Sequence, residues 1–332
     1  MKRTYTILLT LSFALIFPTT VFSQVDEPLP SWTEGEAKQS IVHFVEEVTK
    51  KGGANYVPPS ERIATFDNDG TLWVEYPMYT QALFAFERVK KLAPKHPEWR
   101  NEQPFKALLE GDMKTVGASG MKGLMKIVLA THSGMTATEF AEEAGNWLRT
   151  TKQSRFKHPY AELIYQPQLE LLEYLRANEF KTFIVSGGGI AFMRPMSEEA
   201  YGIPPEQVVG SSVVSEFKMK DGKLELVRMP KIDFVNDKAG KPVGIYQHIG
   251  RRPILAFGNS DSDTQMIQYT MAGKGLRLGL FVHHTDAERE YAYDRKSHVG
   301  VLDMVLDTAD KNDWIIVDMK NDWKVIFPFE MK

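Results

Sequence analysis

Cysteine is absent from the 332 residues of the chain. This absence excludes disulfide bonds, thiol catalysis, thiolate metal sites and attachment of a lipid to a cysteine. Any metal ion that the chain binds must therefore have oxygen or imidazole ligands. A chain without cysteine also suits an oxidising compartment, because no wrong disulfide can form there.

An excess of charge of either sign is also missing. The chain has 40 lysine and arginine residues against 43 aspartate and glutamate residues, which gives a net charge of -3. Because this balance lacks the basic surface of nucleic-acid-binding proteins, we expect no nucleic-acid partner. The 43% of hydrophobic residues and 25% of charged residues are typical of a folded enzyme with one large core or two smaller ones.

Long hydrophobic runs are missing except at the start of the chain. Lys2 and Arg3 precede an apolar run over residues 5–21. A basic start, an apolar stretch and the small residue Ser23 predict a signal peptide over residues 1–23, cleaved after Ser23. The alternative is an uncleaved membrane anchor, which the marginal length of the run and Pro18 disfavour. We expect an exported protein, periplasmic or secreted, with no membrane contact after cleavage.

The second half of the chain alternates apolar strands with helices, and such alternation indicates an α/β fold with a doubly wound parallel sheet. Residues 186–189 (Ser-Gly-Gly-Gly) are expected to form a turn between a strand and a helix. Residues 215–219 and 223–227 are expected to form a β-hairpin. The other expected strands cover residues 63–66, 182–185, 208–214, 253–257, 276–282 and 314–317.

Between the first two of these strands the pattern is helical. Apolar residues recur at spacings of three and four over residues 80–92, 104–109, 113–129 and 136–150. No strand pattern interrupts them, so we expect an all-helical insertion of a size that allows a small domain of its own.

The most chemically suggestive segment is Asp67-Asn68-Asp69-Gly70-Thr71, which directly follows an apolar strand. Ligands of α/β sheets bind at the carboxyl ends of the strands, so Asp67 and Asp69 are expected to face a site. Two carboxylates so close together repel each other unless a cation is nearby, and Mg²⁺ prefers oxygen ligands of this kind. One carboxylate can then attack phosphorus while the other donates a proton to the leaving oxygen.

This segment resembles the first motif of the haloacid dehalogenase superfamily, and specifically that of its phosphoserine-phosphatase-like members. The second motif of that superfamily, a strand that ends in Ser or Thr, is similar to residues 183–186 here. The resemblance implies that the Ser186 hydroxyl and the Gly187 N–H bind the phosphoryl group.

The third motif of the superfamily is a lysine at the start of a helix. Lys241 precedes Pro242 and matches it, with Lys238 as the alternative. The resemblance implies that this lysine stabilises the nucleophile and the phosphoryl group.

The fourth motif is a strand followed by acidic residues, and here the chain departs from the common pattern. Asn259 stands where many members have Asp, while Asp263 matches the second acid. The resemblance implies Mg²⁺ bound by Asp67, by Asp69 through its main-chain carbonyl, by Asn259 and by Asp263. Whether Asn259 or Asp261 completes this set is left open.

The resemblance implies a Rossmann-like α/β core over residues 24–74 and 166–332, with a helical cap over residues 75–165. It also implies a Mg²⁺-dependent phosphomonoesterase for small organic phosphate esters, with Asp67 as nucleophile and Asp69 as general acid and base. The alternatives left open are a non-catalytic protein that binds a phosphorylated ligand and a phosphotransferase or mutase. The physiological ester and the oligomeric state are not determined by the sequence.

Some residues of the expected cap are candidates for contact with the substrate. Glu75 and Tyr76 follow the first motif closely and are placed to face a leaving group. His132, Arg155 and His158 are able to meet a second charge on the substrate. For each of the five, a purely structural role is the alternative.

Overall fold

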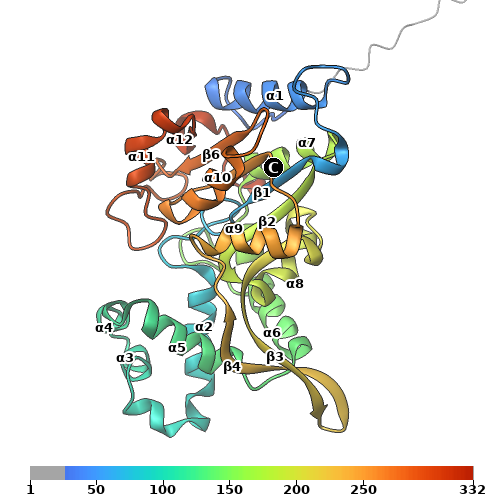
Figure 1. Ribbon diagram of the computed structural model, residues 1–332. Coiled ribbons are helices and arrows are strands. Elements are labelled where there is room, and N and C mark those ends of the chain that lie inside the picture. The colour runs from blue at the N-terminus through green and yellow to red at the C-terminus, as the bar shows by residue number, and fades with distance from the viewer. Residues whose placement is uncertain (1–26, 332) are drawn as a thin grey trace, which may run out of the picture.

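The computed structural model describes residues 27–331, so the predicted signal peptide over residues 1–23 lies outside the described residues. The described part contains a seven-stranded sheet with the order β4-β3-β2-β1-β5-β6-β7 (Figure 1). All neighbouring strands are parallel except β3 and β4, which are antiparallel. The strands are β1 (Ile63–Phe66), β2 (Lys181–Gly189), β3 (Val208–Lys220), β4 (Lys223–Phe234), β5 (Leu255–Gly258), β6 (Leu278–His283) and β7 (Ile315–Asp318).

Helices cover both faces of the sheet. Successive strand residues point to opposite faces, and on each face they belong to a different apolar cluster. Ile184, Phe257 and Leu280 belong to one buried apolar cluster, while their neighbours Val185 and Phe281 belong to another. The first cluster includes residues of α1 (Glu36–Thr49), α7 (Gln166–Ala177) and α8 (Ile190–Tyr201). The second includes residues of α10 (Thr264–Met271) and α11 (Met304–Thr308) and of the turn after α9 (Gly240–Gly244). The predicted doubly wound α/β fold is confirmed.

One detail of the sheet differs from the expectation. Residues 186–189 were expected to form a turn, but they extend β2, and α8 begins directly afterwards at Ile190. The extension pairs with β3 through Gly189 and Ser211, after an irregularity that begins at Val185. The expectation was wrong because three successive glycines resemble a turn, while the neighbouring strand holds them extended.

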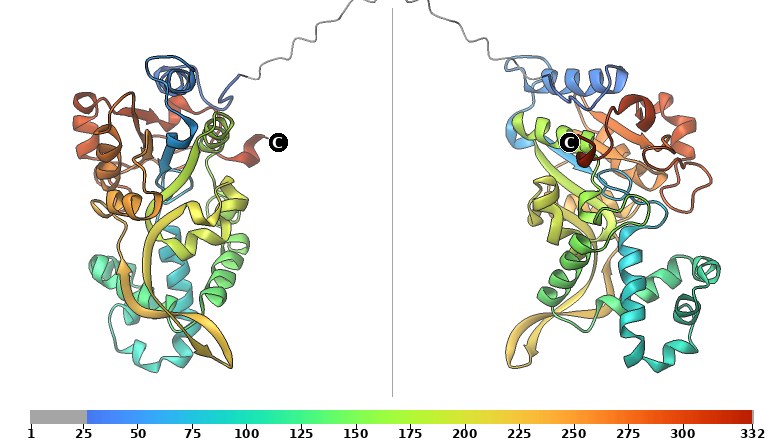
Figure 2. Two further views of the ribbon diagram at one scale, coloured as in Figure 1. Left: turned by 45° about the vertical axis from the view of Figure 1, so that its right-hand side comes forward. Right: turned by 180° about the vertical axis from the view of Figure 1, so that it is seen from behind.

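The segment that follows β1 is helical, as expected, with α2 (Thr80–Leu92), α3 (Phe105–Glu110), α4 (Met113–Ala118), α5 (Gly120–His132) and α6 (Ala137–Thr150). Residues of α2 to α5 form a further buried apolar cluster, whereas the buried apolar residues of α6 belong to the first cluster. Residues 113–129 were expected to form one helix, but Gly120, with φ of +58°, interrupts it. The long ribbon of β3 and β4 lies beside α5 and α6 (Figures 1 and 2). The cap boundaries 75–165 stay a prediction.

The start and the end of the described chain pack together. Trp32 forms an isolated β-bridge with Trp323, and their ring centroids are 6.0 Å apart. The Trp32 indole also donates to the carbonyl of Pro167 at 2.9 Å. Over residues 27–331 we find no helix that has both the length and the apolar character needed to cross a bilayer.

The buried face of β6 gives a test of the fold. Phe281 is fully buried and its ring centroid lies 5.4 Å from that of Trp314, whereas Phe217 on the ribbon is 69% exposed. We expect Phe281→Ala to lower the free energy of unfolding by about 3 to 5 kcal/mol, because it leaves a cavity in the core. The matched control Phe217→Ala should change it by less than about 0.5 kcal/mol. Urea unfolding measures both, and equal effects would contradict the assigned core.

Candidate active site

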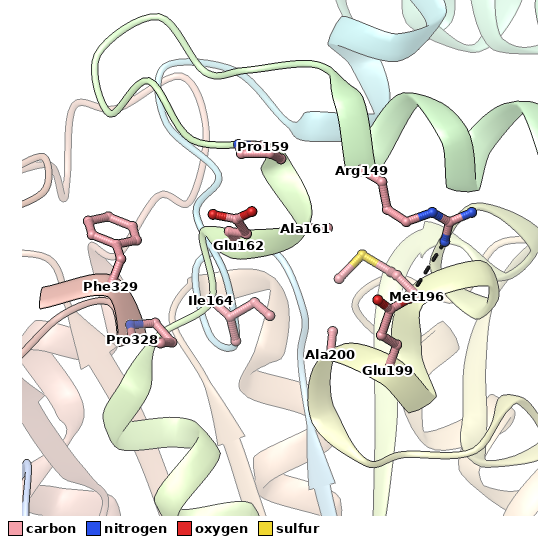
Figure 3. Close-up of a pocket in the computed structure, with 10 residues that line it drawn as sticks. All are labelled: Arg149, Pro159, Ala161, Glu162, Ile164, Met196, Glu199, Ala200, Pro328 and Phe329. Atoms are coloured by element: carbon pink, nitrogen blue, oxygen red, sulfur yellow. Dashed lines mark ion pairs between the residues drawn. The ribbon is translucent and has the colours of Figure 1, made fainter. Parts of the chain in front are cut away.

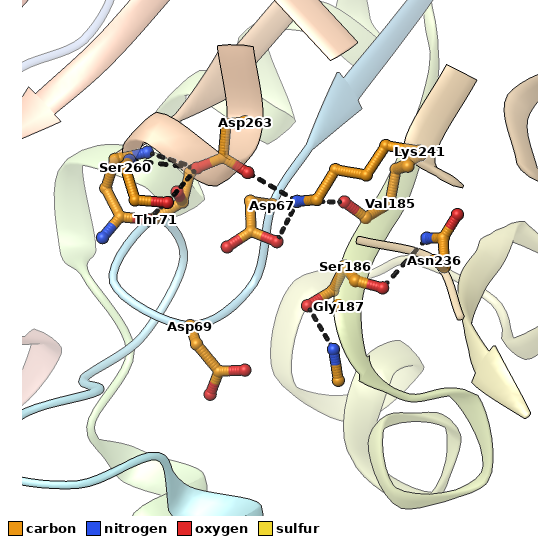
Figure 4. A network of polar contacts seen from close by, with 12 residues as sticks. Asp67, Asp69, Thr71, Val185, Ser186, Gly187, Asn236, Lys241, Ser260 and Asp263 are labelled. Carbon is orange, nitrogen blue, oxygen red and sulfur yellow. Dashed lines mark hydrogen bonds and ion pairs between the residues drawn. The ribbon is translucent and has the colours of Figure 1, made fainter. Parts of the chain in front are cut away.

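Functional side chains from three strands meet at one edge of the sheet (Figure 4). Asp67 directly follows β1, Ser186 lies in β2, and Asn259 directly follows β5. β1 pairs in parallel with both β2 and β5, so the carboxyl ends of all three strands lie side by side. The sheet order thus places the three motifs around one site.

Lys241 is at the centre of this site. Its Nζ donates to Asp67 Oδ1 at 2.6 Å, to Asp263 Oδ1 at 2.5 Å and to the carbonyl of Val185 at 2.9 Å. The side chain of Lys241 is 1% exposed. Lys238, the alternative from the sequence, is exposed. The geometry therefore favours Lys241 as the lysine of the site.

The buried charges around Lys241 influence one another. Burial raises the pKa of Asp67 to about 7, since the charge of Lys241 opposes the shift only in part and the charges of Asp263 and Asp69 add to it. Burial alone would lower the pKa of Lys241, but the charges of Asp263 and Asp67 raise it above its ordinary value. Lys241 therefore stays protonated, and its single positive charge compensates the charges of the neighbouring carboxylates only in part.

Asp69 lies on the same loop as Asp67 and faces Ser186. The indole N–H of Trp73 donates to Asp69 Oδ1 at 2.9 Å. A Cβ on Gly188 would lie 3.4 Å from Asp69 Oδ2 and 3.5 Å from Ser186 Oγ, so both groups face the same small space. Burial raises the pKa of Asp69 to about 6, which allows this carboxyl both to release and to accept a proton near neutral pH.

The expected phosphate-binding groups lie at the end of β2. The Gly188 N–H donates to Ser186 Oγ at 3.2 Å, and the carbonyl of Ser186 accepts from Asn236 Nδ2 at 2.9 Å. The carbonyl of Gly187 accepts from the hydroxyl of Ser211 at 2.8 Å. These contacts fix the backbone on which the Ser186 hydroxyl and the Gly187 N–H are presented.

Asp261 and Asp263, the two acids near Asn259, both accept hydrogen bonds from groups of the protein. Asp263 Oδ2 accepts from the N–H groups of Asn259 and Ser260 and from the Ser260 hydroxyl, while its Oδ1 accepts from Lys241. Asp261 accepts from main-chain N–H groups of residues 303–305, around the start of α11. Asp261 is therefore occupied away from the site, and Asp263 holds Lys241 and the loop after β5.

The oxygen donors of the site fit a magnesium ion. Asp67 Oδ2 accepts no hydrogen bond from any described residue, and Asn259 Oδ1 accepts one, from the Thr71 hydroxyl at 3.1 Å. Among residues 27–331 no three His, Asp or Glu side chains converge on one point, so carboxylates alone do not form the site. A main-chain carbonyl and an amide oxygen, as expected for Asp69 and Asn259, are the further hard ligands that Mg²⁺ requires.

Several residues near the site were not singled out from the sequence. Gln81, on α2, accepts from the Gly189 N–H at 2.7 Å and so links the helical segment to the end of β2. Asn236 and Trp73 support Ser186 and Asp69. The sequence offered Glu75 as a contact of the leaving group, with a structural role as the alternative; in the structure it accepts from Asn259 Nδ2 at 2.6 Å. No local pattern marks these residues, because their partners are distant in the sequence or unremarkable in type.

The other cap candidates lie in structural contacts. His132 is buried against two phenylalanine rings of the helical segment. Arg155 donates to two main-chain carbonyls of the loop after β6. His158 stacks on the ring of Phe329. Tyr76 stacks on Tyr293 at a centroid distance of 5.0 Å.

Figure 3 shows a separate cavity of about 520 Å³. It is lined by the end of α6, the turn Tyr160–Glu162, α8 and residues 328–329. None of the expected site residues lines it, so the candidate active site is the cluster around Lys241.

A sequence model of the haloacid dehalogenase-like hydrolase family matches residues 64–268, more than half of the 332 residues. The chain belongs to this family. The predicted family and the prediction of a hydrolase are thereby confirmed. The match covers β1 through most of α10, so every motif of the haloacid dehalogenase-like site lies within it. No curated protein sequence shows significant similarity to the chain.

Solved structures share the fold at low sequence identity. A protein of unknown function from Bordetella pertussis Tohama I is 15% identical with a TM-score of 0.50, over 78% of this chain and 99% of that one. A conserved functionally unknown protein from Anaerococcus prevotii DSM 20548 is 15% identical with a TM-score of 0.51, over 75% and 86%. A phosphoserine phosphohydrolase-like protein from Francisella tularensis subsp. tularensis SCHU S4 is 14% identical with a TM-score of 0.41, over 76% and 94%. The first two show a shared fold.

The buried lysine gives a test of this haloacid dehalogenase-like site. We expect Lys241→Met to lower the free energy of unfolding by about 3 to 5 kcal/mol near pH 8, because it leaves Asp67 and Asp263 buried without a cation. The loss should shrink near pH 5, since Asp67, whose pKa burial raises to about 7, can then take up a proton. Urea unfolding at the two pH values measures this. The control Lys238→Met, at an exposed position, should change stability by less than about 0.5 kcal/mol. A loss that is the same at both pH values would contradict the charge argument.

Proposed function

We propose that the protein is an exported, Mg²⁺-dependent phosphomonoesterase that acts on small organic phosphate esters through an aspartyl-phosphate on Asp67. The observation that carries this proposal is the state of Asp67. One carboxylate oxygen is fixed by Lys241, and the other accepts no hydrogen bond from the described residues. A carboxylate oriented in this way is suited to nucleophilic attack.

The reaction follows from the positions of the side chains. Asp67 Oδ2 forms a bond to phosphorus while the bond from phosphorus to the ester oxygen breaks, and Asp69 donates its proton to the leaving alcohol. Asp69 then takes a proton from water, and the resulting hydroxide attacks phosphorus. Phosphate leaves, Asp67 is regenerated and Asp69 has its proton again. The Ser186 hydroxyl, the Gly187 N–H and the Lys241 ammonium stabilise the charge on the transferring oxygens.

Magnesium would be held by the Asp67 carboxylate, the Asp69 main-chain carbonyl and the Asn259 amide oxygen. When bound, the ion neutralises the negative charge that the phosphate and the acids share. Asp263, whose two oxygens already accept hydrogen bonds, acts through Lys241 and the loop after β5.

The proposed substrate class and location have separate supports. Gln81 on α2 contacts the end of β2, so the helical segment borders the phosphate-binding groups and limits the space beyond them. This favours small esters. Export is supported by the basic and apolar pattern of residues 1–23.

A second candidate function is favoured by Asn259. An amide at this position supplies one negative charge less than an acid, which weakens metal binding. A protein that binds a phosphorylated ligand without hydrolysing it fits that feature. Asp67, Asp69, Ser186 and Lys241 together favour hydrolysis.

Phosphate release tests the proposed function. The protein without residues 1–23 should release phosphate from p-nitrophenyl phosphate and small monoesters with Mg²⁺ but not with a chelator. Asp67→Asn should lower kcat/KM at least about 10³-fold, because it removes the nucleophile. The control Asp303→Asn, an exposed aspartate paired with Arg295, should keep the rate. A folded protein that binds phosphorylated ligands without turnover would support the binding function instead.

The titration of the site predicts how stability depends on pH and metal. The folded protein holds protons on Asp69 and Asp67 up to pKa values of about 6 and 7, above the ordinary value of 3.8. Stability without metal is therefore expected to fall as the pH rises from about 4 to about 7. Mg²⁺ competes with these protons, so it should stabilise the protein more near pH 8 than near pH 5. At 100 times its dissociation constant, the ion should raise the free energy of unfolding by about 2.7 kcal/mol.

Thermal unfolding with Mg²⁺ or with chelator at both pH values measures this dependence. Potassium chloride at matched ionic strength is the control for general salt effects. A Mg²⁺ effect of equal size at both pH values would show that the ion does not bind to these carboxylates.

A further inference from the structure

Glu75 is a buried carboxylate beside the proposed magnesium site that the proposed reaction does not use. It lies in the loop between the first motif and α2 and is 2% exposed. Its Oε1 accepts hydrogen bonds from Asn259 Nδ2 at 2.6 Å and from the Tyr293 hydroxyl at 3.0 Å. Both partners donate, so Glu75 Oε1 is the acceptor in both contacts.

The backbone leaves room for this carboxylate at two places far apart in the sequence. Gly70, in the first motif, has φ of +75°, and Gly300, before α11, has φ of +54°. A Cβ on either glycine would overlap with Glu75 Oε1. Since burying a carboxylate is costly unless it is paired, this space points to a specific task for Glu75.

The contact fixes the orientation of the Asn259 amide. A carboxylate only accepts hydrogen bonds, so Asn259 turns its NH₂ group towards Glu75. The Thr71 hydroxyl donates to Asn259 Oδ1 at 3.1 Å, which places the amide oxygen on the side of the first motif. That oxygen keeps a second lone pair. The contact with Glu75 thus leaves the amide oxygen of Asn259, and not its NH₂ group, on the side of the first motif.

We infer that Glu75 is a positioning residue of the magnesium site. It orients the amide oxygen of Asn259 towards the first motif, where the ion would be held. The inference rests on the proposed function, because it presupposes that the site binds Mg²⁺. Partners behind a metal ligand set the affinity of the ion by such means.

Metal binding without substrate tests this inference. Calorimetric titration with Mg²⁺ and Mn²⁺ compares the wild type, Glu75→Gln, Asn259→Asp and the double variant. Glu75→Gln should weaken binding about 10-fold to 100-fold. Asn259→Asp alone is the reference for the double variant. An aspartate at position 259 presents an oxygen in either orientation, so the affinity of the double variant should return towards that of the wild type.

Tyr293→Phe is the matched control. It removes the second hydrogen bond to Glu75 Oε1 but keeps the contact of Glu75 with Asn259, so its affinity should stay close to that of the wild type. Thermal unfolding without metal shows whether each variant is folded. If Glu75→Gln does not fold, Glu75→Asp replaces it, because it keeps the charge but shortens the side chain. Glu75→Asp should bind Mn²⁺ more weakly than Tyr293→Phe.

The outcomes separate this inference from the proposed function. Equal affinity of the wild type and Glu75→Gln, or a double variant as weak as Glu75→Gln, would overturn the inference and leave the proposed function intact. If Glu75→Asp is the variant tested, affinity equal to that of Tyr293→Phe has the same meaning. A wild type that binds neither ion would overturn the metal-dependent function, and the inference with it.

Discussion

The ammonium group of Lys241 lies between the carboxylates of Asp67 and Asp263, and the rest of the site depends on this buried contact. A charge that is removed from water must be paired, so the loops after β1 and β5 have to approach the same point. The carbonyl of Val185 brings β2 into the same contact. The sheet order with β1 between β2 and β5 satisfies this demand with neighbouring strands. The position of Asp67, the proposed nucleophile, thus follows from the pairing of one buried lysine.

The same constraint explains why Asp67 and Asp69 differ although they are separated by one residue. Lys241 holds one oxygen of Asp67, which keeps that carboxylate oriented and partly compensated. Asp69 has no such cation, and a neutral indole N–H is its hydrogen-bond donor. Its carboxyl is therefore free to exchange protons on the side of the site that Ser186 faces. These different environments suit Asp67 and Asp69 to the different tasks proposed for them.

The motifs at the strand ends could be predicted because each is local. Asp67 follows an apolar strand and Asn259 follows another, and parallel strands place such residues together. Three glycines after Ser186 were misleading, because their extended conformation depends on pairing with β3 rather than on their own preference. The partners of Glu75 and Gln81 lie 184 and 108 residues away, and no spacing in the sequence indicates such contacts. Likewise, only the fold shows that Lys241 is buried in the site while Lys238 is exposed.

The charge of the cluster connects this fold to phosphate chemistry. Lys241 pairs with Asp67 and Asp263, Asp69 and Glu75 add two further buried carboxyl groups to the site, and a phosphate ester brings further negative charge. Burial raises the pKa of Asp67, Asp69 and Glu75, and the charges of neighbouring acids add to each shift. A protonated Asp67 is a poor nucleophile, so proton retention and attack on phosphorus exclude each other. In the function proposed above, a divalent cation would take the place of these protons and leave Asp67 ionised.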